Sequence, residues 1–389
     1  MIRDVVLVTL TSSIGLVLVF IVGSFARTTA PATVGYLAHL AAALAVFVFA
    51  GLAVPDAVLY DQTASHTAPP GSVILPIGKE GWTTVLTGMY DVFGRLPAVG
   101  LIINVTIAGL TVVLFALIAR QLGLPERRTA WFVALVPSGI LWSSLLLRES
   151  FTWFFVAGCL LGFALIANDR LLGGVVISVV SLAGLFEFRG TAAIILAASG
   201  LVAIPLARRQ WLLLVSAILA AAALTVSPLG SPIRNYIGTY TPLQILVSRE
   251  WLSQNATTGF PVDNIWNVAT RVLLGPAPWE WPTVGSLLAG DGILWVVVLV
   301  LAIWGSWLAP DRHMALLLII PALLLLASLA LTSGNYGTMQ RLRAQPELIL
   351  LPLAAAGSYL GPGRSEAIAK CFSYLPLHPP RRHTVRTLL

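Results

Sequence analysis

Residues 98–118 of the chain read AVGLIINVTIAGLTVVLFALI, an uninterrupted run of 21 residues without a charged side chain. A helix needs ~20 mostly apolar residues to cross the ~30 Å hydrocarbon core of a bilayer. The run is long and shows no alternation with a period of two, so it does not fit the strand of a membrane barrel. It therefore predicts a transmembrane helix and, with it, a helical membrane fold.

The composition of the whole chain agrees with this prediction. Of the 389 residues, 58% are hydrophobic and 10% are charged, and the mean hydropathy is +0.90. Soluble domains carry ~25% charged residues, so a disordered chain and a cytosolic enzyme are both excluded. The two cysteines, Cys159 and Cys371, are too few for a disulfide framework or a thiolate metal site.

Other apolar runs along the chain resemble the first. We expect an all-α, polytopic transmembrane bundle of about 11 spans, a single domain over residues 1–361 that is followed by a basic cytoplasmic tail over 362–389. The segments at about 55–97 and 229–292 predict two large outer-face loops that carry short interfacial helices. The predicted spans are 5–24, 35–54, 98–118, 129–147, 150–167, 172–187, 190–207, 211–228, 293–309, 314–332 and 346–361.

The basic residues predict which side of the membrane each loop occupies. They are mostly arginines, since the only lysines are Lys79 and Lys370, and this bias suggests a GC-rich bacterial genome. They occur in ones and twos between apolar runs, which favours the positive-inside bias of a membrane protein over a nucleic-acid-binding face. We expect a multi-pass protein of the bacterial cytoplasmic membrane that binds no nucleic acid. The chain would begin outside, although Arg3 runs against that orientation.

The acidic residues fall mainly on the other side of the predicted topology. Twelve of the 16 acidic side chains lie on the outer face, and the four inner ones are Glu126, Asp169, Asp311 and Glu366. A protein that only had to span the membrane would not require large outer loops of mixed charge. We therefore expect an active site on the outer face.

The first outer loop places a carboxylate at the membrane boundary. Asp56 and Tyr60 are four residues apart and share one face of a short helix, whereas Asp61 points elsewhere. A carboxylate close to hydrocarbon, with an aromatic neighbour, is suited to act as a general base. The alternative is that Asp56 follows Pro55 in a first helical turn and stabilises the helix dipole, with Tyr60 in the aromatic belt.

Two very short outer turns hold opposite charges. Arg148 adjoins Glu149 in one turn, and Glu187 is followed two residues later by Arg189 in the other. Charges so close to hydrocarbon normally face the bundle interior, pair with each other or line a water-filled cavity. Two interpretations stay open, structural ion pairs with snorkelling arginines or a polar cavity shared by both turns.

The best candidate for anion binding lies just before the last predicted span. Arg341 and Arg343 follow a Gly-Asn-Tyr-Gly turn at 334–337 and run against the positive-inside bias. Arginine is suited to bidentate recognition of phosphate, so we expect both side chains to bind an anion. Lys79, the only lysine on the outer face, is a further candidate for a phosphate contact, with a solvated pair with Glu80 as the alternative.

The second outer loop contains a run rich in proline and tryptophan. Trp279 and Glu280 stand within GPAPWEWP at 275–282. Indole rings near headgroups serve as interfacial anchors, and they also stack on the apolar faces of sugar rings. No His/Cys/Asp cluster with zinc spacing and no G-x-S-x-G nucleophile motif occurs in the sequence.

Taken together, these motifs resemble the C-type (GT-C) glycosyltransferase superfamily, integral membrane enzymes that use polyprenyl-phosphate-linked sugars on the outer face. In this chain the acidic loop follows the second span, whereas in the family it usually follows the first. The matching motifs are Asp56, Tyr60 and Ala64 in a D-x-x-x-Y-x-x-x-A pattern, the stretches Gly81–Asn104 and Pro137–Glu149, and the runs Gly275–Pro282 and Asn335–Arg343.

The resemblance implies a role for each matching residue. Asp56 takes the position of the catalytic base, and Arg341 and Arg343, with Arg189, bind the lipid phosphate and stabilise it as the leaving group. The residues matched to sugar contacts are Glu149, Glu187 and Trp279. Further candidates for substrate binding are Tyr60, Asp61, Lys79, Arg148 and Glu280. The implied partners are a polyprenyl-phosphate-linked sugar donor, a glycan or lipid acceptor and membrane lipids. No cofactor is required by this chemistry, and a divalent cation is left open.

Two other functions remain in view. A polysaccharide repeat-unit polymerase or ligase shares the lipid-phosphate leaving group. A lipid-linked sugar transporter or flippase, from a different functional class, would carry ionisable residues in mid-span and broken helices. Apart from His39, almost no ionisable side chain falls inside the predicted spans, which argues against the transporter.

Overall fold

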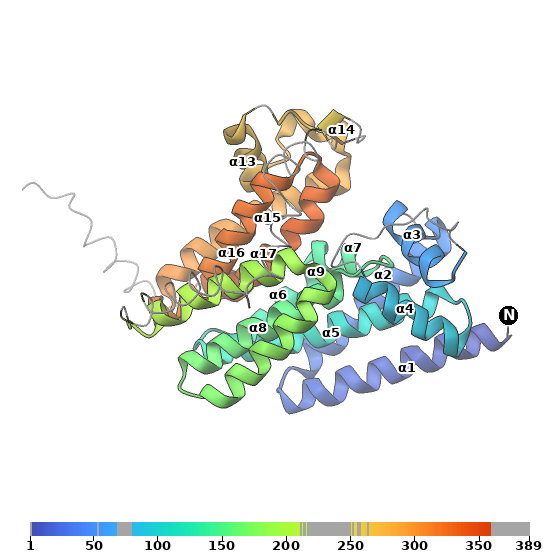
Figure 1. Ribbon diagram of the computed structural model, residues 1–389, viewed down its shortest axis with the longest axis horizontal. Coiled ribbons are helices and arrows are strands. Elements are labelled where there is room, and N and C mark those ends of the chain that lie inside the picture. Colours follow the sequence, from blue (N-terminus) through green and yellow to red (C-terminus); the bar gives the residue numbers. More distant parts are fainter. Residues whose placement is uncertain are drawn as a thin grey trace, which may run out of the picture.

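A computed structural model shows a helical chain (Figure 1). It describes residues 2–52, 54–67, 80–210, 253–254, 258–262 and 264–358, together with 212, 215 and 250. Four of the features predicted from the sequence lie outside the described residues: Lys79, the span at 211–228, most of the second outer loop before residue 258 and the basic tail at 362–389.

Seven helices of the described chain are long and apolar enough to cross a membrane. They are α1 (Ile2–Phe25), α2 (Thr29–Ala50), α5 (Pro97–Gln121), α8 (Glu149–Ala167), α9 (Leu171–Ala207), α15 (Ser286–Leu308) and α16 (Arg312–Thr332). The predicted all-helical, membrane-embedded architecture is therefore confirmed for the described residues, whereas the predicted number of about 11 spans is not reached by these seven helices.

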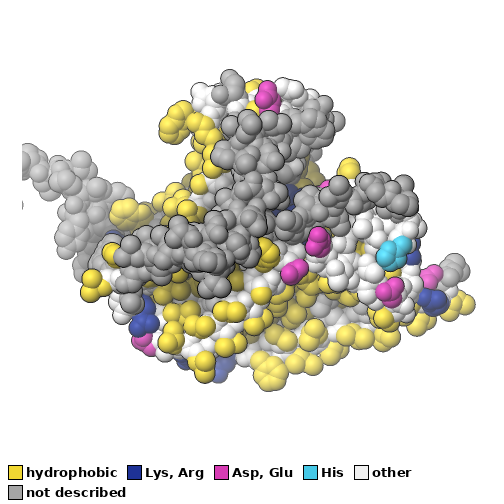
Figure 2. Space-filling view, viewed as in Figure 1, with side chains coloured by type: hydrophobic (Ala, Val, Ile, Leu, Met, Phe, Trp, Pro, Cys, Tyr) yellow, Lys and Arg dark blue, Asp and Glu magenta, His cyan; other side chains and the backbone are white. Residues whose placement is uncertain are grey.

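The outer surface of these helices is apolar, as lipid contact requires. On α1, Val5, Ile14 and Phe20 are all more than half exposed. Figure 2 shows hydrophobic side chains gathered over one broad face of the molecule, with the charged side chains mostly near its ends. In water such a continuous apolar surface would cause aggregation, so hydrocarbon is the solvent that this face fits.

Helix α9 contains a sharp turn at Arg189. With 37 residues, a straight helix at ~1.5 Å per residue would be almost twice as long as the ~30 Å hydrocarbon core. The backbone of Arg189 is not helical, with φ −159° and ψ 82°, and the chain changes direction there.

Both halves of α9 run along the same neighbour, α8. Gly162 of α8 leaves space for Ser178 of the first half, since a Cβ on this glycine would lie 2.2 Å from the serine hydroxyl. Gly200 of the second half lies against the ring of Phe163, also on α8. After the second half, Arg208 donates to the carbonyl oxygen of Ile166 near the end of α8. The two halves therefore form a helical hairpin, in agreement with the two separate spans predicted here.

The prediction of a single span at 129–147 is wrong. The chain forms two short helices instead, α6 (Glu126–Leu135) and α7 (Pro137–Ser143). Between them Val136 is extended, with φ −62° and ψ 125°. A residue that precedes proline is driven out of the helical region by a clash with the proline ring, so Pro137 breaks the span.

A buried, non-helical segment connects α7 to α8. Its carbonyl groups at Leu145 and Leu147 accept hydrogen bonds from the side-chain amide of Asn104 on α5, at 2.9 and 2.8 Å. Irregular backbone at membrane depth is tolerated only where protein groups satisfy its polar atoms. Asn104 performs this task, and the segment leads directly to Arg148 and Glu149.

Helix α17 (Tyr336–Gly357) forms the centre of the bundle. It begins ten residues before the span predicted at 346–361, and it is almost wholly buried. It lies beside α15, which it approaches closely at Gly305 and Gly357, because a Cβ on Gly305 would come 1.8 Å from the carbonyl oxygen of Leu353. Figure 1 shows α15, α16 and α17 rising together from the layer formed by α1, α5, α8 and α9.

The short helices predicted for the outer loops lie at one end of the bundle, which we call the loop end. They are α3 (Pro55–Ala64), α4 (Glu80–Phe93), α13 (Ile265–Leu274), the 3-10 helix η2 (Pro278–Glu280) and α14 (Trp281–Val284). Arg3 donates to the carbonyl oxygen of Phe93, so the N-terminus of α1 also lies at the loop end.

The opposite end of the bundle carries a cluster of arginines, and we call it the arginine end. Arg120, at the end of α5, donates to the carbonyl oxygen of Ala26 between α1 and α2. The arginines at this end are Arg27, Arg120, Arg127, Arg128, Arg170, Arg208, Arg209 and Arg312. The charge difference between the two ends therefore follows the bias read from the sequence.

Candidate functional site

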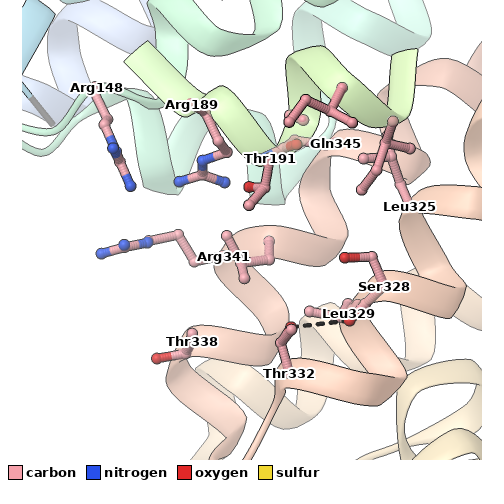
Figure 3. A pocket seen from close by; sticks show the side chains of 14 residues that line it. Arg148, Arg189, Thr191, Leu325, Ser328, Leu329, Thr332, Thr338, Arg341 and Gln345 are labelled. Atoms are coloured by element: carbon pink, nitrogen blue, oxygen red, sulfur yellow. Dashed lines mark hydrogen bonds between the residues drawn. The ribbon is translucent and has the colours of Figure 1, made fainter. Parts of the chain in front are cut away.

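A cavity of about 480 Å³ lies at the loop end, between the second half of α9, α16 and α17 (Figure 3). One wall is apolar, with Ile194 and Ile195 from α9 and Leu325 and Leu329 from α16. Hydroxyl and amide groups border this wall. They belong to Thr191, Ser328, Thr332, Thr338 and Gln345. Such a combination suits a ligand with both an apolar and a polar part.

Three arginines line one end of the cavity, each from a different element. Arg148 ends the non-helical segment before α8, Arg189 lies at the turn of α9, and Arg341 projects from the second turn of α17. Figure 3 shows the three guanidinium groups pointing toward one another at the open side of the cavity. The two short charged turns thus bring Arg148 and Arg189 to one cavity that Arg341 also lines, and Arg189 at the same time forms an ion pair with Glu149.

Two carboxylates accompany the arginines. Glu149 Oε1 accepts a hydrogen bond from Arg189 Nη2 at 2.8 Å, and Arg341 Nε lies 3.1 Å from the same oxygen. Arg341 Nη1 donates to Asp56 Oδ2 at 2.7 Å. Glu149 is fully buried, whereas the side chain of Asp56 is 31% exposed. Arg341 therefore bridges the first outer loop and the N-terminus of α8.

Tyr60 completes this cluster. Its side chain is buried beside Asp56, Arg148, Glu149 and Arg341, with which it interacts electrostatically. Burial raises the pKa of its hydroxyl, so the phenol stays protonated and can donate a hydrogen bond. That hydroxyl has no hydrogen-bond partner among the described residues.

This cluster carries one net positive charge when its five charged groups are ionised. Its members are Asp56, Tyr60, Arg148, Glu149, Arg189 and Arg341. Several arginines that converge on one point recognise phosphate or carboxylate. The geometry therefore favours an anionic ligand.

Other residues predicted for the site lie elsewhere. Asp61 is buried against α4, where it accepts hydrogen bonds from Tyr90 at 2.7 Å and from Arg95 at 2.5 Å, and so joins α3 to α4. Glu187 is exposed on α9 just before the turn, and it does not line the cavity.

Arg343 also points away from the cavity, in contrast to the prediction that it would bind the same anion as Arg341. Two residues on a helix are separated by ~200° of rotation, so the two side chains lie on opposite faces of α17. Arg343 is 1% exposed and lies 3.5 Å from Asp291. It donates to the carbonyl oxygen of Gly275 at 2.7 Å and covers the ring of Trp295. Its position indicates a structural role between α15 and α17.

Trp279 and Glu280 lie on the far side of α17 from the cavity. Trp279 is 80% exposed in η2. Glu280 accepts hydrogen bonds from Arg271 at 2.9 Å and from the hydroxyl of Tyr336. Although burial by itself raises the pKa of Glu280, hydrogen bonds from Tyr336, the Ala277 backbone and Arg271 outweigh it and lower this pKa. Glu280 thus fastens the second outer loop to the start of α17.

Sequence reasoning missed a buried carboxylate on α17. Glu347 is 1% exposed and accepts a hydrogen bond from Ser138 of α7 at 2.7 Å, while its other oxygen has no partner among the described residues. The estimate that His39 was almost alone as an ionisable residue within the spans is therefore wrong. Glu347 follows Arg343 by four residues, a spacing that places both on one helical face.

Among the described residues, no group of three or more His, Cys, Asp or Glu side chains is arranged to hold a metal ion. The divalent cation left open by the sequence therefore has no set of protein ligands in this part of the chain.

No protein-family model matches this chain, and a search of the curated proteins finds no significant match.

Proposed function

We propose that the protein is a membrane glycosyltransferase of the GT-C type, which moves a sugar from a polyprenyl-phosphate-linked donor to a glycan or lipid acceptor in bacterial cell-envelope synthesis. This proposal rests on one observation: three converging arginines and an apolar wall line the same cavity at the loop end.

A lipid phosphate fits both parts of this cavity. The phosphate accepts hydrogen bonds from Arg148, Arg189 and Arg341, which lie at the head of the cavity. The first isoprene units lie against the branched side chains of α9 and α16, and the remainder of the chain continues into the bilayer. A free sugar nucleotide has no hydrocarbon to occupy the apolar wall, so the lipid-linked donor is the better match.

The residues support a direct displacement at the sugar. A hydroxyl of the acceptor attacks the anomeric carbon and forms the new glycosidic C–O bond, while its proton passes to the carboxylate of Asp56. The bond between the anomeric carbon and the phosphate oxygen breaks, and its electron pair leaves with the lipid phosphate. Arg341 and Arg189 stabilise the charge that develops on this leaving group.

Placement of this site on the outer face of the cytoplasmic membrane is part of the proposal. It is supported by the arginine end, which the positive-inside bias assigns to the cytoplasm. The test uses Thr67→Cys at the loop end and Arg127→Cys at the arginine end, both exposed, in a chain without Cys159 and Cys371. An impermeant maleimide should label only the first in intact spheroplasts, and labelling of only the second would reverse the orientation.

The transfer reaction is tested with purified protein in nanodiscs and a panel of polyprenyl-phosphate and polyprenyl-diphosphate sugars carrying a labelled sugar. Label should move to the acceptor, and Asp56→Asn and Arg341→Ala should each abolish most of this transfer. Asp91→Asn, an exposed acid on α4, and Arg208→Ala, at the arginine end, serve as controls that keep full transfer. Transfer that survives Asp56→Ala combined with Arg341→Ala in a folded protein would overturn the proposal. A preference for diphosphate donors would instead assign the polymerase or ligase reaction.

One observation favours the transporter as a second candidate. The broken segment α6–α7, with Glu347 buried against Ser138, provides the interrupted helix and the intramembrane carboxylate that such proteins use. Translocation of a fluorescent short-chain polyprenyl phosphate across proteoliposomes without any acceptor would support this function. Transfer without such translocation would exclude it.

A further inference from the structure

We propose that Glu149 is an internal substitute for the donor phosphate: its carboxylate occupies the anion position between Arg189 and Arg341, and the phosphate must displace it to bind. This inference rests on the proposed function, because it assigns a role to Glu149 within that donor site.

The position of Glu149 Oε1 is that of a bound anion oxygen. It receives Arg189 Nη2 from the α9 turn at 2.8 Å, and Arg341 Nε from α17 lies 3.1 Å away. These two guanidinium groups belong to different elements, and both contact this oxygen. A phosphate oxygen bound by the same two arginines would need the same place, so carboxylate and phosphate compete.

The ion pair between Glu149 and Arg189 leaves one polar atom of each side chain without a partner among the described residues. Glu149 Oε2 and Arg189 Nη1 are buried, and neither has a hydrogen-bond partner among the described residues. Arg341 Nε is within ion-pair distance of Glu149 but is not aligned as a hydrogen bond. A buried polar atom without a partner is unfavourable, so both side chains keep an atom that a ligand can engage.

The unpaired atoms match the two chemical groups of a sugar phosphate. Arg189 Nη1 is a free donor for a phosphate oxygen, and Glu149 Oε2 is a free acceptor for a hydroxyl group. When the phosphate takes the arginines, the carboxylate of Glu149 can accept a hydroxyl of the donor sugar or that of Tyr60. Glu149 thus acts as a positioning residue that exchanges one partner for another.

The inference predicts a gain of affinity from a loss of charge. Glu149→Gln keeps the size of the side chain but removes the negative charge that competes for the arginines. Farnesyl phosphate should therefore bind the variant about tenfold tighter or more than the wild type. If Glu149 only held the two arginines in place, its replacement would weaken binding instead, so the sign of the change decides between the two roles.

The experiment is isothermal titration of the full-length protein in detergent with farnesyl phosphate, with inorganic phosphate and farnesol in separate titrations. Inorganic phosphate should show the same gain at lower affinity, whereas farnesol should show none. The matched control is Glu126→Gln, which removes a carboxylate paired with Arg120 at the arginine end and should leave farnesyl phosphate binding unchanged. If Glu149→Gln does not fold, Glu149→Asp withdraws the carboxylate from both arginines and should also tighten binding.

Unchanged or weaker binding of farnesyl phosphate by the folded Glu149 variants, with normal binding by the wild type, would overturn this inference alone. Absence of farnesyl phosphate binding in both the wild type and the variants would overturn the proposed donor site as well. If the Glu149 variants bound farnesol more tightly than the wild type, as well as farnesyl phosphate, this would also contradict the inference, because displacement of a carboxylate requires an anion.

Discussion

Arg341 and Asp56, which are 285 positions apart in the sequence, are joined by a hydrogen bond of 2.7 Å from Nη1 to Oδ2. The bond connects the second turn of α17 to the start of α3. Because the same guanidinium group also faces Glu149, Arg341 sets the spacing between the proposed base and the proposed anion position.

Arg341→Lys should reduce transfer about 10²-fold, because a lysine ammonium is a point charge that cannot hold Asp56 and Glu149 in the planar geometry of a guanidinium. The measurement is the initial rate of sugar transfer in nanodiscs at saturating donor. A matched Arg208→Lys variant should keep the wild-type rate. A rate within twofold of wild type for Arg341→Lys would show that only the charge is needed.

Asn104→Ala should destabilise the fold by about 2–4 kcal/mol, since it removes the donors to the buried carbonyl groups of Leu145 and Leu147. Thermal unfolding in detergent measures this change. Asn168→Ala removes an amide that caps α8 at an exposed position and should cost at most about 1 kcal/mol. Equal effects of the two substitutions would contradict the role assigned to Asn104.

Gly305→Ala should separate α15 from α17, because the new Cβ would lie 1.8 Å from the carbonyl oxygen of Leu353. We expect a loss of about 1–3 kcal/mol. Gly290→Ala, on the same helix, meets nothing within 4 Å and should stabilise α15 by about 0.5–1 kcal/mol. Unfolding temperatures of the two variants that shift in the same direction would show that the helices do not cross at Gly305.

Arg343→Met should cost about 3–5 kcal/mol, because it leaves Asp291 buried without its positive partner. Combining it with Asp291→Asn should recover part of this loss, and a double-mutant cycle measures the coupling. Additive losses would show that the pair does not interact. Farnesyl phosphate should bind folded Arg343→Met as it binds the wild type, since Arg343 does not line the cavity.

The attachment of the second outer loop to α17 should weaken at acidic pH. The pKa of Glu280 is lowered in the folded protein from its ordinary value of 4.5, so its contribution to stability is present above that value and is lost as the pH falls through the lower, folded pKa. Glu280→Gln should remove this part of the pH dependence. The measurement is the unfolding temperature of the wild type and of Glu280→Gln between pH 7 and pH 3. If the two proteins lost stability in parallel as the pH falls, Glu280 would not contribute to the pH dependence.

Much of the helical architecture could be predicted because span length and hydropathy are local properties. Residues 98–118 became α5 with little change in bounds, and the two spans on either side of Arg189 became the arms of the α9 hairpin. The prediction of helix bounds failed where one residue changes the backbone although the mean hydropathy of the segment stays high. Pro137 breaks the run at 129–147, and α17 begins within a stretch that reads as a polar turn.

The candidate site could be predicted only in part. The sequence singled out Asp56, Tyr60, Glu149, Arg189 and Arg341, whose residue types and membrane-boundary positions are visible without a structure. It could not show that Arg343 faces α15, because a helical start at Tyr336 had not been predicted there. Nor could it show the burial of Glu347, since an acidic residue near a span end reads as exposed.

The sequence by itself determined that this protein is a bundle of apolar helices with most of its charges outside the apolar runs, because lipid penalises a charge that no protein group covers. The buried Arg343 and Glu347 within α17 are exceptions that it did not show. Only the tertiary structure decided which of these charges meet. Arg189 reaches Glu149 because α9 reverses on itself, and Arg341 reaches Asp56 because α17 crosses the bundle centre. Such contacts depend on the relative placement of whole helices, which no local pattern of residues encodes.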